Sequence, residues 1–347
     1  MIDYRIRGGF VQRIGRCAGR SHTIRRARRG DSVLYEYDRQ DLRVTRTPVS
    51  RTEVYTRTEI TFDSLAPSNH PESDTVIAHL FEPHHRRARR PVVFLHGMGK
   101  YAFEPLLPFP RKLAERGVPA LFLNLPLHFD RAPAGQEGGR LFMLDDLDDN
   151  LLNFRQAVVD IRSCVDLLEN EGLAPAGCTL LGISFGGILG TIAMGVDERI
   201  ENAVLCVTGG NLLYIIWHSI FARTLRRENP GAVRAITEQA GGRGGERRYR
   251  QYLESLDSPE DLDGLDETLK CALCDPLTFA GFIRGRKVVM YNAIFDPIVP
   301  HEASHELWQE LGCPERHFML CEHNTIVIYR RTIVRRTAEL AGARRGA

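Results

Sequence analysis

The sequence of 347 residues contains no long uninterrupted apolar run. No stretch reaches the roughly 18 apolar residues from which a membrane-spanning helix is recognised. Residues 1–5, Met-Ile-Asp-Tyr-Arg, also lack the apolar centre of a secretion signal. The sequence therefore predicts a protein without integral membrane association and with a cytoplasmic location.

An excess of either charge is missing as well. The 46 basic and 44 acidic residues give a formal net charge of +2, so the chain has no global field that would attract nucleic acid. Two runs of Arg-Arg-Ala-Arg-Arg, at 25–29 and 86–90, are interpreted as solvated surface, and no nucleic-acid partner is expected. The segment 5–29 has the arginine-rich, acid-poor composition of a transit peptide, but an uncleaved surface helix is the favoured interpretation.

A loop framework of cysteines, typical of disulfide-rich proteins, is also absent. Several of the eight cysteines fall within apolar strand or helix patterns, which favours buried free thiols. Cys271 and Cys274 have the spacing of a metal or redox motif, but no second pair at zinc-finger spacing accompanies them, so packing is the favoured role. The eight cysteines are Cys17, Cys164, Cys178, Cys206, Cys271, Cys274, Cys313 and Cys321.

What the sequence does contain is a lone serine in a glycine-rich turn. Residues 182–187 read Gly-Ile-Ser-Phe-Gly-Gly and lie between an apolar run at 178–181 and a helical pattern. Glycine two residues before and two residues after Ser184 allows a turn that is too sharp for a Cβ atom. Such a nucleophile elbow places the hydroxyl at a helix N-terminus, where N–H groups favour a developing negative charge. The pattern predicts a nucleophilic serine.

A nucleophilic serine needs a histidine as base and a carboxylate that orients the histidine. Asp296 follows an apolar run at 287–293 that is typical of a strand, and His323 follows a last short run at 317–321. The chain order is therefore serine, acid, histidine, which is the order of the α/β-hydrolase architecture. Asp275 is a rival acid, but it does not follow a strand of the predicted core.

The oxyanion that forms during acyl transfer needs two backbone N–H groups aimed at one point. Phe185, the residue after the serine, can supply one of them. The second is assigned to the amide of Met98, in the His-Gly-Met-Gly loop at 96–99 that follows a strand predicted at 91–95. The glycines of this loop let the main chain approach a substrate closely.

From about Thr75 to the C-terminus the chain resembles an α/β-hydrolase of the esterase and dienelactone-hydrolase-like kind. The matching pieces are the loop 96–99, the elbow 182–187, the Asp-Pro-Ile-Val-Pro segment at 296–300 and His323. The resemblance implies hydrolysis of an ester, thioester, lactone or amide through an acyl-enzyme, with no cofactor. The closest dienelactone hydrolases use a cysteine at the elbow, where this chain has serine.

The fold class that follows is α/β, with the α/β-hydrolase arrangement of a mostly parallel central sheet covered by helices on both faces. Alternating residues at 54–62 and at 75–81 predict an N-terminal antiparallel hairpin. The clearest helix is expected at 149–169, and a further helix at 303–311. The predicted core strands lie at 91–95, 120–125, 178–183, 203–207, 287–293 and 317–321.

One catalytic domain with an insertion accounts for the length of the chain. Residues 1–50 are charged and irregular and are interpreted as an N-terminal arm. Residues 51–207 and 287–347 are interpreted as the hydrolase core. The intervening residues 208–286 far exceed an ordinary connection, so we expect an inserted helical lid.

Polar side chains near the predicted oxyanion loop are candidate substrate contacts. His96 opens that loop, and His128, Asp130 and Arg131 follow the strand predicted at 120–125. Ligands bind at the carboxyl edge of open α/β sheets, where these residues are expected. The alternative is a loop held together by its own Asp–Arg pair.

The predicted lid begins with an apolar stripe. Tyr214, Trp217, Phe221 and Leu225 recur at three- and four-residue intervals. On a helix these side chains share one face. The stripe either roofs an acyl pocket, with Tyr214 and Trp217 as substrate contacts, or packs the lid onto the sheet.

A second motif competes with the triad. Residues 301–305 match His-Glu-x-x-His, which on a helix would present His301 and His305 to zinc with Glu302 as base. The motif needs a third ligand and falls on the helix expected between the acid loop and the histidine loop. The triad is therefore favoured, and no metal is expected.

The function predicted from the sequence is a serine hydrolase that cleaves a carboxylic ester, with Ser184 as nucleophile, His323 as base and Asp296 as orienting acid. The expected partner is a small-molecule acyl substrate, and the oligomeric state is left open. Thioesterase, lactonase or peptidase activity with the same triad remains open. A hydrolase-fold module that only binds a ligand is the alternative from another class.

Overall fold

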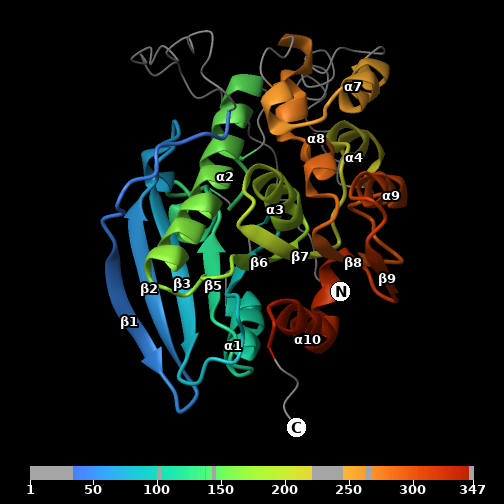
Figure 1. Cartoon of the computed structure of the whole chain (residues 1–347). Coiled ribbons are helices and arrows are strands. Elements are labelled where there is room, and N and C mark those ends of the chain that lie inside the picture. The colour runs from blue at the N-terminus through green and yellow to red at the C-terminus, as the bar shows by residue number, and fades with distance from the viewer. Residues whose placement is uncertain are drawn as a thin grey trace. The chain divides into compact units, whose positions relative to one another are not determined.

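The fold is centred on one β-sheet. The strands follow the order β1-β2-β3-β5-β4-β6-β7-β8-β9 in a nine-stranded sheet (Figure 1). The computed structural model describes residues 34–99, 104–136, 138–142, 146–220, 245–262 and 267–343.

Antiparallel strands form the N-terminal part of the sheet. β1 (Thr45–Arg51), β2 (Tyr55–Asp63) and β3 (Thr75–Pro83) pair in sequence order, and β3 pairs antiparallel with β5 (Ala120–Asn124). The predicted antiparallel hairpin is thus confirmed as β2 and β3.

The sequence pattern does not predict β1, because it assigns residues 1–50 to an irregular arm. Every residue of β1 is exposed, since this edge strand has neither face against the core. Its side chains consequently lack the alternation of apolar and polar residues from which strands are predicted. Residues 1–33 of the predicted arm lie outside the described residues.

The remaining strands run parallel and confirm a strand at each predicted apolar run, except that β9 (Glu315–Met319) begins two residues before the run predicted at 317–321 and is not buried. β4 (Val92–Leu95), β6 (Cys178–Ile183), β7 (Ile200–Cys206) and β8 (Lys287–Ala293) are largely buried, and β9 is the second edge of the sheet. β5 pairs parallel with β4. Because parallel strands end at the same edge of a sheet, the loops that follow them gather there.

Helices cover both faces of the sheet (Figure 1). α2 (Leu147–Asn170) and α3 (Phe185–Val196) pack on one face, together with α8 (Pro276–Ala280). α1 (Pro108–Ala114) and α10 (Arg330–Leu340) lie side by side on the other face. Each face therefore has its own apolar core, as the burial of the central strands requires.

The predicted helix at 149–169 corresponds to α2, whose first amides are capped by the Asp146 side chain. The helix predicted at 303–311 corresponds to α9 (His301–Glu310). Within the described residues, no helix has the length and apolar character that crossing a bilayer would require. Short 3₁₀ helices lie at Pro71–Ser73, Glu104–Leu106, Phe129–Arg131 and His323–Tyr329.

The segment between β7 and β8 is largely helical where it is described. It contains α4 (Leu212–His218) and α7 (Gly245–Glu254), followed by α8. Phe221 and Leu225 of the predicted stripe lie outside the described residues. The division of the chain into arm, core and lid stays a prediction. The 3₁₀ helices of the segment are Pro259–Leu262, Glu267–Cys274 and Gly281–Ile283.

The cysteines of the described part of the chain are free thiols, as expected. Burial raises the pKa of the Cys164, Cys178 and Cys206 thiols well above the ordinary value, which keeps them protonated and unreactive. Cys313 departs from the expectation, because its side chain is exposed. Cys17 lies outside the described residues.

Candidate active site

Ser184 lies at the turn between the end of β6 and the start of α3. Its backbone has φ 53° and ψ −117°, a conformation that L-residues rarely adopt. A Cβ on Gly182 would lie 2.7 Å from the Gly186 carbonyl oxygen, and a Cβ on Gly186 would lie 2.6 Å from the His96 carbonyl oxygen. Both distances are shorter than real Cβ contacts. The glycine positions are therefore required by the close approach of backbone segments.

The three predicted catalytic side chains form one line of hydrogen bonds. His323 Nε2 lies 2.8 Å from Ser184 Oγ, and His323 Nδ1 lies 2.8 Å from Asp296 Oδ2. With Nδ1–H donating to the carboxylate, Nε2 is left to accept the serine proton. His323 is 5% exposed, so its imidazole is nearly shielded from water.

The Asp296 carboxylate is fixed from its other side by its own loop. Asp296 Oδ1 accepts hydrogen bonds from the amides of Ile298 and Val299, both at 2.9 Å. These bonds restrain the carboxylate while it faces His323. The Asp-Pro-Ile-Val-Pro sequence thus supplies both the acid and the amides that orient it.

The two segments that contain the predicted oxyanion donors flank the serine. Phe185 is the first residue of α3, and the first N–H groups of a helix have no helical acceptor. The loop with Met98 approaches from β4, since a Cβ on Gly97 would lie only 3.2 Å from Ser184 Cβ. The space beside Ser184 therefore lies between the two segments whose amides were assigned to the oxyanion.

His96 is not placed as a substrate contact. Its side chain is fully buried, Nδ1 donates to the Gly97 carbonyl oxygen at 2.8 Å, and Nε2 accepts from the Leu125 amide at 3.1 Å. Burial lowers the pKa of His96 well below its ordinary value, so the ring is neutral, as this pattern of bonds requires. The imidazole therefore ties the loop after β4 to the end of β5.

His128 is also fully buried rather than facing a substrate. Its Nδ1 donates to the Pro126 carbonyl oxygen at 2.8 Å, and Nε2 has no hydrogen-bond partner among the described residues. Burial lowers its pKa to about 4. Its ring centroid lies 5.0 Å from that of His96, so the two neutral imidazoles pack together beneath the loops.

Arg131 is likewise a buried structural residue, and its partner is not Asp130. Its guanidinium lies 2.6 Å from Asp160 Oδ2 on α2, and it also donates to the carbonyl oxygens of Ser73 and Asn124. Asp160 accepts a further bond from Ser64 Oγ at 2.6 Å. The pair anchors the loop after β5, which also contains the Leu125 amide that binds His96.

Tyr214 and Trp217 lie on α4. The Tyr214 ring stacks on His218 with centroids 4.1 Å apart, and Trp217 is 38% exposed. The Ile220 amide donates to the Pro297 carbonyl oxygen at 3.0 Å, which joins the end of this segment to the acid loop. Contact of Tyr214 and Trp217 with a substrate stays a prediction.

The rival acid Asp275 has a different role. Its carboxylate accepts hydrogen bonds from the amides of Asn211, Leu212 and Leu277. Asp275 therefore caps α8 and ties it to the start of α4. Of the two carboxylates, Asp296 is the one that bonds to His323.

The two histidines of the zinc motif each contact a different part of the protein. His301 Nε2 donates to the Ile294 carbonyl oxygen at 2.8 Å, and the His305 ring stacks on Trp308 with centroids 5.3 Å apart. Among the residues that the structure describes, no group of three or more His, Cys, Asp and Glu side chains is arranged to hold a metal ion.

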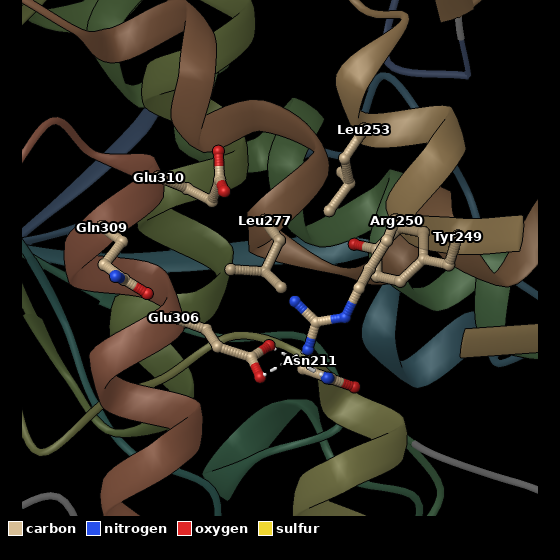
Figure 2. A pocket seen from close by; sticks show the side chains of 8 residues that line it. All are labelled: Asn211, Tyr249, Arg250, Leu253, Leu277, Glu306, Gln309 and Glu310. Carbon is tan, nitrogen blue, oxygen red and sulfur yellow. Dashed lines mark hydrogen bonds and ion pairs between the residues drawn. The ribbon is translucent and has the colours of Figure 1, made fainter. Parts of the chain in front are cut away.

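A small pocket, whose lining does not include Ser184, opens between α7 and α9 (Figure 2). Arg250 of α7 forms an ion pair with Glu306 of α9 at 2.9 Å, and Asn211 Nδ2 donates to the same carboxylate at 3.0 Å. These bonds connect α7 to the core through α9. The pocket is lined by Asn211, Tyr249, Arg250, Leu253, Leu277, Glu306, Gln309 and Glu310.

Sequence patterns name Ser184, Asp296 and His323, which the structure joins by hydrogen bonds, but they do not name the groups that hold these residues and their loops in place. The amides of Ile298 and Val299 and the amide of Leu125 are backbone groups, which sequence patterns do not single out. Asp160 and Arg131 are separated by 29 residues and meet only through the packing of α2 on the sheet.

The sequence profile of the Alpha/beta hydrolase family matches residues 92–346, from the start of β4 to near the C-terminus. Acetyl xylan esterase from Paenibacillus sp. R4 is similar in structure, with a TM-score of 0.56, 18% identity, and coverage of 86% of this chain and 89% of that chain. Acetyl xylan esterase 1 from Thermoanaerobacterium sp. JW/SL YS485 has a TM-score of 0.57 and 14% identity, covering 88% of this chain and 90% of that chain.

A third similar structure is the acylaminoacyl peptidase of Pyrococcus horikoshii, with a TM-score of 0.54 and 15% identity, covering 84% of this chain and 41% of that chain. At such identities the likeness concerns the fold alone. No curated protein matches the sequence.

Replacing Asp160 by asparagine tests the buried ion pair. The substitution leaves the Arg131 charge buried without its counter-ion, so we expect the free energy of unfolding to fall by about 3–5 kcal/mol. Asp130→Asn, at the exposed neighbour of Arg131, should change it by less than about 0.5 kcal/mol. Urea unfolding of both variants measures the difference, and equal stability of the two would contradict the assigned pairing.

Proposed function

The chain belongs to the alpha/beta hydrolase family, and from that premise we propose that it is a serine hydrolase that cleaves a carboxylic ester through an acyl-enzyme. The observation that carries the proposal is the hydrogen-bonded line from Asp296 through His323 to Ser184. The Nδ1 and Nε2 atoms of His323 each lie 2.8 Å from their oxygen partner. These side chains come from three distant segments, and each follows the carboxyl end of a parallel strand.

In the first step Ser184 Oγ attacks the ester carbonyl carbon while His323 Nε2 removes the hydroxyl proton. Asp296 stabilises the imidazolium that results. The carbonyl oxygen becomes an oxyanion, for which the amides of Phe185 and Met98 are the proposed donors. Each such donor contributes about 3–4 kcal/mol to transition-state stabilisation.

The tetrahedral intermediate then collapses. The bond between the carbonyl carbon and the leaving oxygen breaks, and His323 returns its proton to the leaving alcohol. Water, deprotonated by the same imidazole, attacks the acyl-enzyme, which releases the carboxylic acid and restores Ser184. No cofactor takes part, because every proton is carried by the triad itself.

An ester is the proposed substrate class because an alcohol leaves readily once His323 protonates it. Two of the similar structures are named as acetyl xylan esterases and one as an acylaminoacyl peptidase. The same triad geometry serves thioesters, lactones and peptides, which therefore remain the alternative substrates. Tyr214 and Trp217 on α4 are proposed to contact the acyl part, since the segment after α4 bonds to the acid loop.

The proposal predicts that Ser184→Ala lowers kcat for hydrolysis of p-nitrophenyl acetate by about 10⁴-fold or more. The alanine removes the nucleophile and keeps the fold, since the small side chain fits the same turn. Circular dichroism of the variant provides the control for folding. Wild-type turnover in a folded Ser184→Ala protein would leave the triad without a catalytic role.

The identity of the acid can be tested separately. Asp296→Asn no longer accepts the Nδ1 proton of His323, so the unfavourable tautomer should lower kcat by about 10⁴-fold. Asp275→Asn is the matched comparison, because among the described residues the hydrogen-bond partners of Asp275 lie between β7 and β8 and do not include His323. Its kcat should stay within about tenfold of the wild-type value. A larger loss in Asp275→Asn than in Asp296→Asn would reverse the assignment.

A further inference from the structure

A turn that contains no triad residue contacts both residues whose amides are assigned to the oxyanion. Residues 138–142 form this turn, between the loop after β5 and α2, and we name it the clamp segment. Its residue Gly139 lies against the side chain of Met98, and its last residue, Phe142, packs on the ring of Phe185. The two oxyanion segments therefore share one neighbour.

The first contact requires a glycine in the clamp segment. Gly139 has φ 76°, and a Cβ at this position would lie 3.0 Å from Met98 Cγ and 2.4 Å from His128 Nε2. The Gly139 amide donates to the Leu127 carbonyl oxygen at 2.7 Å, which fixes the turn to the loop after β5. The backbone of the clamp segment is thus seated directly on the side chain of Met98, in the loop after β4.

His128 supports the clamp segment at this contact. Its ring is fully buried and packs on the rings of His96 and Phe142, with centroids 5.0 and 6.2 Å apart. A ring held in this way has little room to move, because close-packed interiors resist added volume. A side chain at position 139 would therefore displace the clamp segment or the loop with Met98 rather than the imidazole.

The second contact is made by an aromatic side chain. The Phe142 ring is fully buried and lies edge-on to the Phe185 ring, with centroids 4.7 Å apart and planes at 79°. It also packs edge-on to Phe154 of α2, at 5.3 Å. Edge-to-face pairs have a preferred geometry in addition to their apolar burial. The position of the first residue of α3 is therefore coupled to the position of Phe142.

One side chain of α2 holds the end of the clamp segment in place. Asn153 Nδ2 donates to the carbonyl oxygens of Leu141 and Phe142, at 3.1 and 3.2 Å. Asn153 is 2% exposed, so a shift of the clamp segment would leave a buried amide and two carbonyl groups without these bonds. The turn therefore acts as a rigid connection between its two contacts.

We propose that Gly139 and Phe142 are positioning residues for the oxyanion, which hold the loop with Met98 and the first turn of α3 at the separation that two converging amides require. The proposal rests on the proposed ester hydrolysis, which assigns the two amides. Both residues are buried and act through Met98 and Phe185. Donors must lie about 2.7–3.1 Å from the oxyanion, so a small change in their separation has a large effect on the rate.

Gly139→Ala tests the first contact, and the chain offers a matched control. Gly135 has φ 77°, nearly the same as Gly139, but a Cβ there would have no atom within 4 Å. Gly135→Ala therefore introduces the same backbone strain without pressing on any neighbour. A difference between these two variants reports the displacement of the clamp segment alone.

Phe142→Leu tests the second contact, with Phe109→Leu as its control. Phe109 is also fully buried and packs on another ring, that of Phe94, at 5.3 Å. It belongs to the apolar core on the opposite face of the sheet from Phe142. Both substitutions remove a buried ring and should lower stability alike. Urea unfolding and circular dichroism establish the folded fraction of all four variants.

We expect kcat per folded molecule for p-nitrophenyl acetate to fall about 100-fold in Gly139→Ala and Phe142→Leu, with KM within about threefold of the wild-type value. The loss should lie in kcat because a displaced donor weakens an interaction made only in the transition state. Gly135→Ala and Phe109→Leu should keep kcat within about threefold. Unchanged kcat in the two clamp variants, or an equal loss in their controls, would overturn the proposal, because the clamp segment would then be structural only.

A second readout requires no turnover. The amide resonances of Met98 and Phe185 are followed in ¹H–¹⁵N correlation spectra of the same four variants. We expect Gly139→Ala to shift the Phe185 amide and Phe142→Leu to shift the Met98 amide, since a rigid segment transmits each change to its other end. The two control variants should shift neither amide.

Variants that shift only the amide on their own side would overturn the positioning role. The spectra also separate this proposal from the proposed chemistry. A wild-type protein that hydrolyses no ester, but whose two amides respond together, contradicts the chemistry alone. Ester hydrolysis that depends on Ser184, with kcat unchanged in Gly139→Ala and Phe142→Leu, contradicts the clamp segment alone.

Discussion

The turn at Ser184 holds a non-glycine residue at φ 53°, a conformation that costs on the order of 1–3 kcal/mol and must be stabilised by its surroundings. The Ser184 amide donates to the Cys206 carbonyl oxygen at the end of β7, and the Ser184 carbonyl oxygen accepts from Gly187 at 2.8 Å. The absence of side chains at Gly182 and Gly186 lets β4, β6 and α3 meet there. The direction of the Ser184 hydroxyl, and with it the proposed attack on the substrate, depends on this close packing of β4, β6 and α3.

The surrounding loops are positioned by buried polar groups. His96 joins the loop after β4 to the end of β5, and the Arg131–Asp160 pair fixes the loop after β5 to α2. Asp275 in turn connects α4 to α8. Because each of these groups is buried and bonded, a shift of one loop would leave polar atoms without partners, which resists the shift. The site is thereby held rigid by residues that do not take part in the reaction.

The sequence predicts those parts of the fold whose physical cause is local. Three such features can be identified from the sequence. They are the apolar runs of the buried strands, the glycine pattern around Ser184, and the order of serine, acid and histidine. β1 cannot be identified in this way, because an exposed edge strand carries no apolar pattern. His96 and His128 look like surface ligands in sequence, since burial and neutral charge arise from packing between distant segments. The ion pair between Asp160 and Arg131 cannot be predicted from the sequence either, because these residues meet only when α2 packs on the sheet.

The proposed chemistry requires that the hydroxyl of Ser184 is activated by its hydrogen bond to His323. Intact-protein mass spectrometry after incubation with a fluorophosphonate at neutral pH tests it most directly, because such reagents modify activated serines. We expect one adduct per chain, located by peptide mapping on Ser184. An unmodified protein, or an adduct on another residue, would contradict it and would favour a hydrolase-fold module that binds a ligand without catalysis.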